Sequence, residues 1–239
     1  MSEIKEKFLY ETHLHTSPIS ACGRFGVREN LLFYKNLGYA GVFITNHFVD
    51  GNIGCDRALP YEEQVEFYFS ECEEAKRLGE EIGIDVFYAV ESSYHGTDFL
   101  IYGLDKEFYL SHPEWSSVKR SDLLLTLREA GAFVVQAHPY REAFYIDHIR
   151  LFPRHIEAVE VINSSNPEPF MNEMANAYAE MYGLIKSAGS DNHFADKYCR
   201  DLDAVAFSHR LESVGDFIAS MRRGEGEIVK IPNPNKQKS

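Results

Sequence analysis

The sequence is short of cysteine, of basic residues and of long apolar runs, and each shortage excludes a class of protein. Its four cysteines show neither CxxC spacing nor the density of a secreted disulfide scaffold. We therefore expect reduced thiols and a cytoplasmic location. No apolar run approaches the roughly 20 residues that a membrane-spanning helix needs. The polar N-terminus does not resemble a signal peptide, so we expect no membrane partner.

Basic residues are outnumbered, with 24 Lys and Arg against 37 Asp and Glu, which gives a formal net charge of −13. A surface of that sign repels duplex nucleic acid unless a local basic patch opposes it. A general nucleic-acid binder is therefore disfavoured, although short oligonucleotides stay open. A small anionic substrate also stays open, because bound metal cations can reverse the field inside a pocket.

The chain also lacks a linker or low-complexity segment that would divide its 239 residues. We expect one domain over residues 1–230, and a frayed tail rich in Pro, Asn and Lys over residues 231–239. Short apolar runs alternate with amphipathic stretches, which predicts roughly seven or eight strand–helix units of a largely parallel α/β fold. Helices are predicted at residues 28–37, 61–82, 121–130, 170–182 and 214–222, and a strand at 84–90.

A closed or distorted barrel is favoured over an open doubly wound sheet, although periodicity alone does not separate the two. Residues able to bind metals stand at the C-terminal ends of the apolar runs. They are His13, His15, His47, Glu91, His138, Asp191 and His193. In a parallel barrel these ends converge on one face, where such folds build their active sites.

The local spacing of these residues also fits metal binding. His13-x-His15 on a strand directs both imidazoles to one side, and Asp191-x-His193 repeats the spacing with a carboxylate. Imidazole with carboxylate suits Zn²⁺, Mn²⁺ or Fe²⁺. Each residue alone is more often a structural or ion-paired group. Their joint placement predicts a metal site.

Five segments resemble, in order, the successive motifs of the PHP (polymerase and histidinol phosphatase) family. They are His13-Leu14-His15-Thr16, Thr45-Asn46-His47, Ala89-Val90-Glu91, Ala137-His138-Pro139 and Gly189-Ser190-Asp191-Asn192-His193. Residues 159–163 also match, and the resemblance spans about residues 8–209. It implies a distorted (β/α)7 TIM-like barrel that binds up to three divalent metal ions. It also implies that the seven residues are ligands, with Glu91 bridging two ions.

Three positions depart from the family pattern. Where the family often has a later His after its first motif, this chain has Cys22, which is either a thiolate ligand or an inert thiol. Asp98 stands where a further His often precedes a strand, and the neighbouring His95 competes for that role. Asn46 replaces an Asp; it can orient a neighbour by hydrogen bonding but adds no negative charge.

Four basic residues lie close in sequence to the proposed ligands and could bind a substrate phosphate. They are Arg24, Arg141, Lys197 and Arg200. Guanidinium groups suit this task because two N–H donors match two phosphate oxygens. For any one of them, a surface ion pair is the more common role.

Together these features predict a metal-dependent phosphoesterase, either a phosphatase or a phosphodiesterase. It would hydrolyse a small phosphorylated metabolite or nucleotide through a metal-activated hydroxide. No GxSxG segment indicates a protein nucleophile. The alternatives are a 3′–5′ exonuclease on short single strands, a hydrolase of non-phosphate bonds and a non-catalytic metal-binding module. The sequence identifies neither the substrate nor the native metal.

Overall fold

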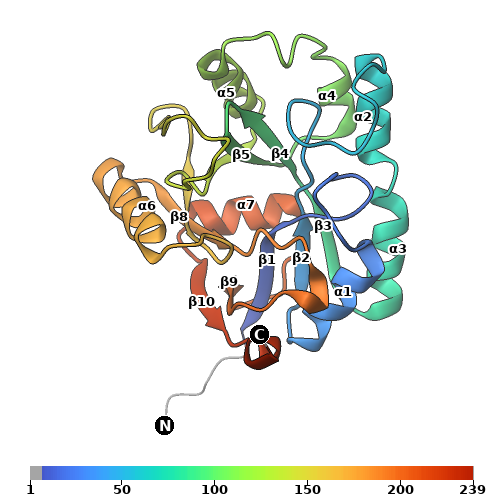
Figure 1. Ribbon diagram of the computed structural model, residues 1–239, viewed down its shortest axis with the longest axis vertical. Helices are drawn as coiled ribbons and strands as arrows, with labels where there is room; N and C mark the ends of the chain where they lie inside the picture. The colour runs from blue at the N-terminus through green and yellow to red at the C-terminus, as the bar shows by residue number, and fades with distance from the viewer. Residues whose placement is uncertain (1–6, 239) are drawn as a thin grey trace.

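Ten strands and seven α-helices lie along residues 7–238, which are the residues that the computed structural model describes (Figure 1). The strands are β1 (Phe8–Leu14), β2 (Gly41–Ile44), β3 (Asp85–Tyr88), β4 (Val90–Tyr94), β5 (Thr97–Tyr102), β6 (Phe133–Ala137), β7 (Ala158–Asn163), β8 (Ile185–Gly189), β9 (Leu202–Phe207) and β10 (Glu227–Ile231). The α-helices are α1 (Val27–Asn36), α2 (Tyr61–Phe69), α3 (Cys72–Ile82), α4 (Lys106–Leu110), α5 (Arg120–Glu129), α6 (Pro169–Tyr182) and α7 (Val214–Arg222). Two short 3₁₀-helices are η1 (Ala195–Lys197) and η2 (Pro234–Lys238).

The strands form two five-stranded sheets, with orders β10-β9-β1-β2-β3 and β4-β5-β6-β7-β8. The α/β class is thus confirmed, but the expectation of a largely parallel fold is wrong. The pairs β1–β2, β2–β3, β6–β7 and β7–β8 are parallel, whereas β1–β9, β9–β10, β4–β5 and β5–β6 are antiparallel. One cause is the tight turn between β4 and β5, where His95 and Gly96 both have positive φ, as two-residue hairpin turns require.

The two sheets meet at single bridges rather than along a continuous ladder. Leu14 bridges to Asn192 beyond β8, and His47 beyond β2 bridges to Glu91 in β4. Among residues 7–238 the strands therefore do not close into one hydrogen-bonded barrel, and the (β/α)7 barrel of the prediction is not confirmed. Both bridges join residues at strand ends, and each includes or adjoins a predicted metal ligand.

Two predicted elements are divided in the structure. The helix expected over residues 61–82 breaks between α2 and α3, where the Ser70 hydroxyl donates to the Phe67 carbonyl at 2.7 Å and competes with the helix ladder. The break lets Glu71 accept a hydrogen bond from the Thr16 hydroxyl at 2.5 Å. The strand expected over residues 84–90 divides at Ala89 into β3 and the start of β4, which belong to different sheets.

The segment expected to fray contacts the body of the protein. β10 extends to Ile231, and the buried Asn233 side chain donates to the Tyr198 carbonyl at 2.7 Å. Asn235 donates in turn to the Asp196 carbonyl. Amide side chains thus bind residues 233 and 235 to the loop after β8, while the fraying expected of residues 231–239 stays a prediction. Ser239 lies outside the described residues, and the single-domain organisation of residues 1–230 stays a prediction.

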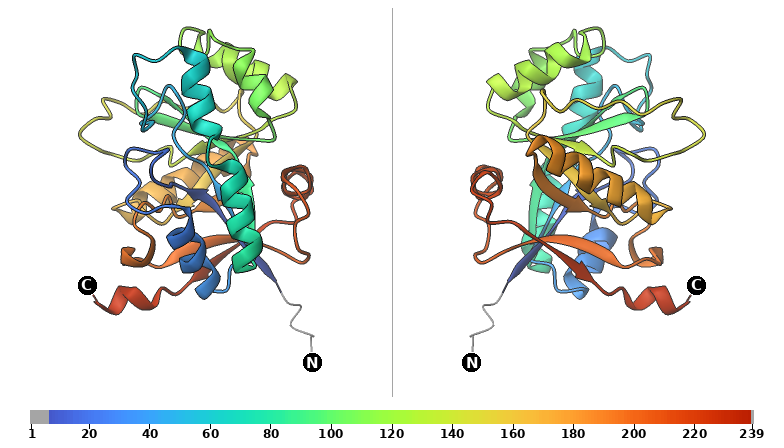
Figure 2. Two further views of the ribbon diagram at one scale, coloured as in Figure 1. Left: turned by 90° about the vertical axis from the view of Figure 1, so that its right-hand side faces the viewer. Right: turned by 90° about the vertical axis from the view of Figure 1, so that its left-hand side faces the viewer.

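Apolar side chains fill one end of the space between the sheets. The ring of Phe217 in α7 lies 4.5 Å from that of Phe43 in β2 and 5.0 Å from that of Tyr102 in β5, measured between centroids. α7 thereby packs against both sheets at once. α3 and α6 cover opposite sides of the molecule, as the two side views show (Figure 2). The polar strand ends consequently face away from the end that α7 fills.

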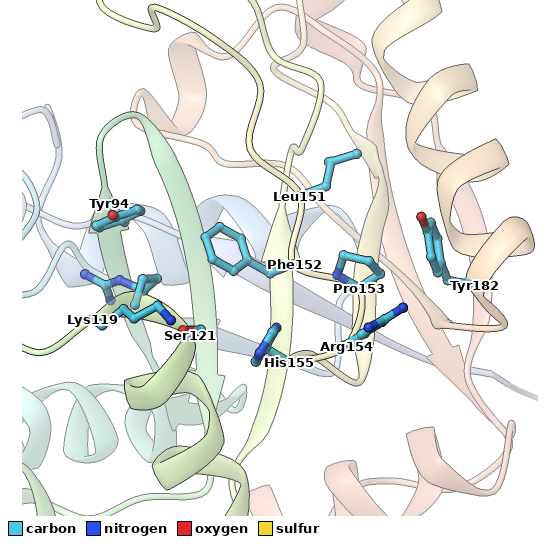
Figure 3. Close-up of a pocket in the computed structure, with 10 residues that line it drawn as sticks. Tyr94, Lys119, Ser121, Leu151, Phe152, Pro153, Arg154, His155 and Tyr182 are labelled. Atoms are coloured by element: carbon cyan, nitrogen blue, oxygen red, sulfur yellow. The ribbon is translucent and has the colours of Figure 1, made fainter.

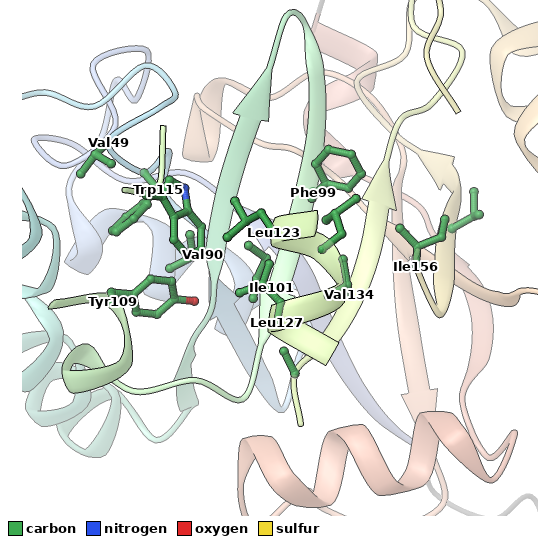
Figure 4. Close-up of a cluster of buried hydrophobic side chains, with 14 of the residues drawn as sticks. Val49, Val90, Phe99, Ile101, Tyr109, Trp115, Leu123, Leu127, Val134 and Ile156 are labelled. Carbon is green, nitrogen blue, oxygen red and sulfur yellow. The ribbon is translucent and has the colours of Figure 1, made fainter. Parts of the chain in front are cut away.

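A second apolar cluster supports β4, β5 and β6 from outside. Phe99, Ile101 and Val134 pack there with Leu123 and Leu127 of α5 (Figure 4). Figure 4 also shows Trp115 beside Tyr109 in the same cluster. Burying such side chains contributes roughly 25 cal/mol per Å² of apolar surface, so this packing holds the strands that carry part of the polar end. No helix among the described residues is long and apolar enough to cross a membrane.

Candidate metal centre

The strand ends of both sheets bring the predicted ligands together. All seven of them, together with Cys22 and Asp98, fall into four overlapping groups. Each residue of a group offers one ligand atom, and the ligand atoms of a group all lie within 4.8 Å of one another. The groups are His13–His138–Asp191, His13–His15–Glu91, Glu91–Asp98–His138 and His15–Cys22–His47–His193. Residues separated by up to 180 positions in the sequence thus share one centre. His13, His15, Glu91 and His138 each belong to two groups, so the four groups lie next to one another.

Glu91 occupies the middle of this centre. Its Oε1 lies 3.0 Å from His13 Nε2, and its Oε2 lies 3.3 Å from His15 Nε2. The same Oε2 lies 2.7 Å from His47 Nδ1. A carboxylate that faces imidazoles through both oxygens is placed as a bridging ligand would be.

Three of the imidazoles are oriented through their Nδ1 atoms. His13 Nδ1 lies 3.0 Å from Glu160 Oε1, His15 Nδ1 lies 2.9 Å from Ser20 Oγ, and His193 Nδ1 lies 2.8 Å from the Asp191 carbonyl. Such contacts fix the tautomer of a metal-binding histidine and leave Nε2 free for the ion. The Nε2 atoms of His13 and His15 accordingly meet at 3.2 Å.

Unpartnered polar atoms at the centre fit a bound cation. His47 Nδ1 and Glu91 Oε2 are both buried, yet neither has a hydrogen-bond partner among the described residues despite their 2.7 Å separation. Buried polar atoms rarely stay unpaired. His47 Nδ1 and Glu91 Oε2 are close but not aligned for a hydrogen bond, which is the arrangement expected of two atoms that bind the same metal ion.

The electrostatics differ between two neighbouring imidazoles of the centre: carboxylates favour positive charge at His13, and burial keeps His15 neutral. Burial lowers the pKa of His13, but the neighbouring Glu160, Asp191 and Glu91 outweigh it and raise that pKa well above its usual value. Burial and the neighbouring His193 lower the pKa of His15 to about 3, so its imidazole is neutral. Neutral imidazole is the form that binds a metal. The field and the donor atoms therefore both suit a divalent cation.

Two of the predicted ligands have a strained backbone conformation. His138 has a φ of +27° and Asp191 a φ of +53°, a region that L-residues seldom adopt. The His138 amide donates to Glu160 Oε2 at 3.0 Å, and the Asp191 amide donates to the His13 carbonyl at 2.8 Å. Strain of this kind persists where surrounding contacts impose it, which is common at functional sites.

Glu160 contacts two of the predicted ligands, although the sequence alone assigned it no role. Its Oε1 faces His13, while its Oε2 accepts from the His138 amide and from Asn163 Nδ2. Gly189 makes room for this arrangement, because a Cβ there would lie 2.5 Å from the Cβ of His13 and 2.8 Å from Glu160 Oε1. The matching segment at residues 159–163 was the available signal, but it carried no role for the carboxylate.

The two doubtful ligands lie at the edge of the centre. Asp98 Oδ2 is 3.7 Å from His138 Nε2. Cys22 lies among His15, His47 and His193. Burial raises the pKa of Cys22, but hydrogen bonds with His193 and His47 outweigh it and lower that pKa to about 6. His95 lines the same cavity but belongs to none of the four groups.

Asn46 supports the centre from behind. Its Oδ1 accepts from the Thr16 amide at 2.7 Å and from the Ser20 hydroxyl at 2.8 Å. Its Nδ2 donates to Glu71 Oε1 at 3.0 Å. Since Ser20 orients His15, Asn46 acts through hydrogen bonds and not through charge.

The centre opens into a cavity of about 530 Å³ whose lining includes His47, Glu91, Asp98, His138 and Asp191. Two basic residues line it, Arg57 and Arg141. Arg57 was not among the predicted substrate-binding residues. The other three that were predicted, Arg24, Lys197 and Arg200, are exposed and are not part of this lining.

Arg141 is occupied by protein contacts. It donates to Asp191 Oδ2 at 2.6 Å, to Asn163 Oδ1 at 2.8 Å and to Asn166 Oδ1 at 3.0 Å. These contacts use all three guanidinium nitrogens. Arg141 therefore positions Asp191, and its guanidinium has no nitrogen left without a protein partner to bind a phosphate in the cavity.

A second cavity of about 550 Å³ lies at the start of α5, between Tyr94, Phe152 and Tyr182 (Figure 3). Arg120 lines this second cavity, and Asp50 lines the cavity of the metal centre. The Arg120 guanidinium and the Asp50 carboxylate form an ion pair at 3.0 Å between the two cavities. None of the proposed ligands lines this second cavity. We therefore place the candidate functional site at the strand ends.

Comparisons with known proteins agree with this fold. A scan against known protein families finds no match, and a search of curated proteins finds none either. Among solved structures, PsfC from Pseudomonas syringae PB-5123 is 17% identical, with a TM-score of 0.64 over 98% of this chain and 94% of that chain. A two-domain protein from Bacteroides vulgatus, containing a predicted PHP-like metal-dependent phosphoesterase, is 16% identical, with a TM-score of 0.60 over 94% of this chain and 65% of that chain.

An amidohydrolase from Chromobacterium violaceum is also similar, with 15% identity and a TM-score of 0.52 over 77% of this chain and 87% of that chain. At these identities the likeness concerns the fold. The resemblance to the PHP family, stated from the sequence motifs, agrees with the fold of these neighbours.

Proposed function

We propose that this chain is a metal-dependent phosphoesterase that acts on a small phosphorylated metabolite or nucleotide. The observation that carries the proposal is the position of Glu91, whose carboxylate faces three imidazoles within 3.3 Å at the floor of an open cavity. Ligand groups adjoin on both sides of it. Two or three divalent ions, Zn²⁺, Mn²⁺ or Fe²⁺, would fit there side by side.

Bound ions of this kind lower the pKa of water towards neutrality and stabilise charge on phosphoryl oxygens. The residues of the chain have the remaining tasks. Glu160 and Ser20 hold the imidazoles of His13 and His15, and Arg141 holds Asp191. Arg57 lines the cavity, and its guanidinium donates to the Val49 carbonyl at 3.0 Å and to the Gly51 carbonyl. It would bind a substrate phosphate only by exchanging these contacts for phosphate oxygens.

A small substrate is favoured over a nucleic-acid strand. A volume of about 530 Å³ lies within the roughly 300–1,000 Å³ of ordinary small-molecule sites. Single-strand binders combine a basic groove with a series of aromatic platforms. The described lining of this cavity has two arginines and one aromatic residue, Tyr145, and the chain carries a net charge of −13.

The test is an assay of the metal-loaded protein against phosphomonoesters, phosphodiesters and short single-stranded DNA, with metal content measured on the same sample. We expect turnover of a small phosphoester, and its loss in Glu91→Gln. The exposed Cys199→Ser is the matched control and should retain activity. Cleavage of DNA alone would support the exonuclease instead. Full metal loading without turnover of any phosphoester would contradict the proposal and favour a non-catalytic module or another hydrolase.

A further inference from the structure

Cys22 is held in place beside the metal centre by the backbone on either side of it. The Ala21 amide donates to the Asn52 carbonyl at 2.9 Å, and the Arg24 amide donates to the His193 carbonyl at 2.9 Å. The Gly23 amide also donates to the Ser20 carbonyl at 3.0 Å, closing a turn. The thiol is thus directed to the centre by a braced loop.

The ligand atoms around Cys22 differ in kind from those on the other side of Glu91. Cys22, His47, His193 and His15 form a group of three imidazoles and one thiol, with no carboxylate. The group of Glu91, Asp98 and His138 has two carboxylates and one imidazole. Thiolate and imidazole are soft or intermediate ligands that select zinc, whereas carboxylates suit harder ions such as Mn²⁺.

The spacing of the first group fits zinc. Tetrahedral bonds of roughly 2.0–2.3 Å place ligand atoms roughly 3.3–3.8 Å apart. The four ligand atoms lie within 4.8 Å of one another, so modest side-chain rotations would close the site. His15 also belongs to the group with His13 and Glu91, so the metal position at Cys22 lies next to the one at Glu91.

We propose that Cys22 binds a metal ion as a thiolate, together with His47 and His193, and makes this position selective for zinc. The position at Glu91, Asp98 and His138 then prefers a harder ion, so the loaded protein holds two different metals. This inference rests on the metal centre proposed above, and it concerns only which ion each position selects.

The test uses metal binding and no assay of activity. The metal-free protein is loaded with Co²⁺, and a sulfur-to-cobalt charge-transfer band is sought in the near-ultraviolet spectrum. We expect the band in the wild type and in Cys199→Ser, and its loss in Cys22→Ser. Loading from an equimolar mixture of Zn²⁺ and Mn²⁺ should give both metals in the wild type, and about one zinc fewer per chain in Cys22→Ser.

Cys22→His separates loss of the thiolate from misfolding. This variant should bind as many ions as the wild type while lacking the charge-transfer band. A cobalt-loaded wild type without the band, or a Cys22→Ser protein with the wild-type zinc content, would overturn the inference while leaving the metal centre standing. A wild type that binds no metal under any loading would instead contradict the centre itself.

Discussion

His13 and Glu160 face each other at 3.0 Å, and both side chains are fully buried. The carboxylate draws Nδ1–H towards itself, so that Nε2 of His13 is left to face Glu91. His138 depends on the same carboxylate, since its amide donates to the other oxygen. One buried glutamate thus orients two predicted ligands from different strands.

Glu160→Gln should weaken metal binding without removing a ligand. The amide retains the shape of the carboxylate but neither its charge nor its two acceptors, so His13 and His138 lose their orientation. Changes to such outer partners typically cost about 10–100-fold in metal affinity. Competition with a chelator measures this, and Glu157→Gln, near the surface on the same segment, is the control. Equal affinity in both variants would show that Glu160 has no orienting role.

Gly189→Ala should disturb the same contact through packing. The added Cβ would lie 2.5 Å from the Cβ of His13, which is buried and fixed in β1. Overpacking of this kind typically costs about 1–3 kcal/mol of stability, and His13 should also move away from Glu91. Gly215→Ala is the control, because its nearest neighbour would be 3.6 Å away. Denaturant unfolding and metal affinity should change in the first variant only.

The buried pair of Asp50 and Arg120 should dominate the stability of the wall between the two cavities. Their side chains are 6% and 4% exposed and lie 3.0 Å apart. Arg120→Met leaves the buried Asp50 carboxylate with no countercharge. Its remaining donors are neutral and come from Ser92, Ser93 and Trp115. Loss of the countercharge of a buried ion pair costs about 3–5 kcal/mol. A double variant, Asp50→Asn with Arg120→Met, should recover part of that loss. Denaturant midpoints test this, and Arg77→Met, at an exposed pair with Glu74, should leave the midpoint unchanged.

Arg57 and Arg141 should differ in what they affect. Arg141→Met releases Asp191 from its 2.6 Å partner and should reduce metal content and kcat together. Arg57→Met removes a cavity-lining guanidinium that donates to the Val49 and Gly51 carbonyls and, within residues 7–238, to none of the predicted ligands, so it should raise KM for a phosphoester while metal content stays at the wild-type level. Steady-state kinetics beside elemental analysis separates these effects. A loss of metal content in Arg57→Met, with only a raised KM in Arg141→Met, would show that Arg57 supports the metal centre and Arg141 binds the substrate.

The convergence of the candidate ligands could be predicted from the sequence because their signal is local. His13-x-His15 and Asp191-x-His193 show their spacing of two residues directly, and His47 and His138 each follow an apolar run that becomes a strand. Glu91 also follows an apolar run, but that run divides between β3 and β4, and Glu91 lies near the start of β4. Their convergence needed only strand ends that meet at one place. It did not require the distorted (β/α)7 barrel that we expected.

The supporting residues could not be predicted in the same way. Glu160 approaches His13 across 147 positions, and Asp50 meets Arg120 across 70. No local pattern marks such a pair. The break at Ser70 was missed because the sequence on both sides favours a helix, while Glu71 is needed by Thr16 and Asn46. Arg57 was overlooked although it follows His47 by ten positions, because the loop between them shows no pattern that would place its guanidinium at the cavity.

Elemental analysis of the purified protein, as isolated and after loading with Zn²⁺ and Mn²⁺, tests the central claim most directly. The account predicts two or three tightly held divalent ions per chain, and fewer in His138→Ala, which removes a residue shared by two of the ligand groups. A folded wild type that holds no divalent ion after loading would contradict it. So would an unchanged number of ions in His138→Ala.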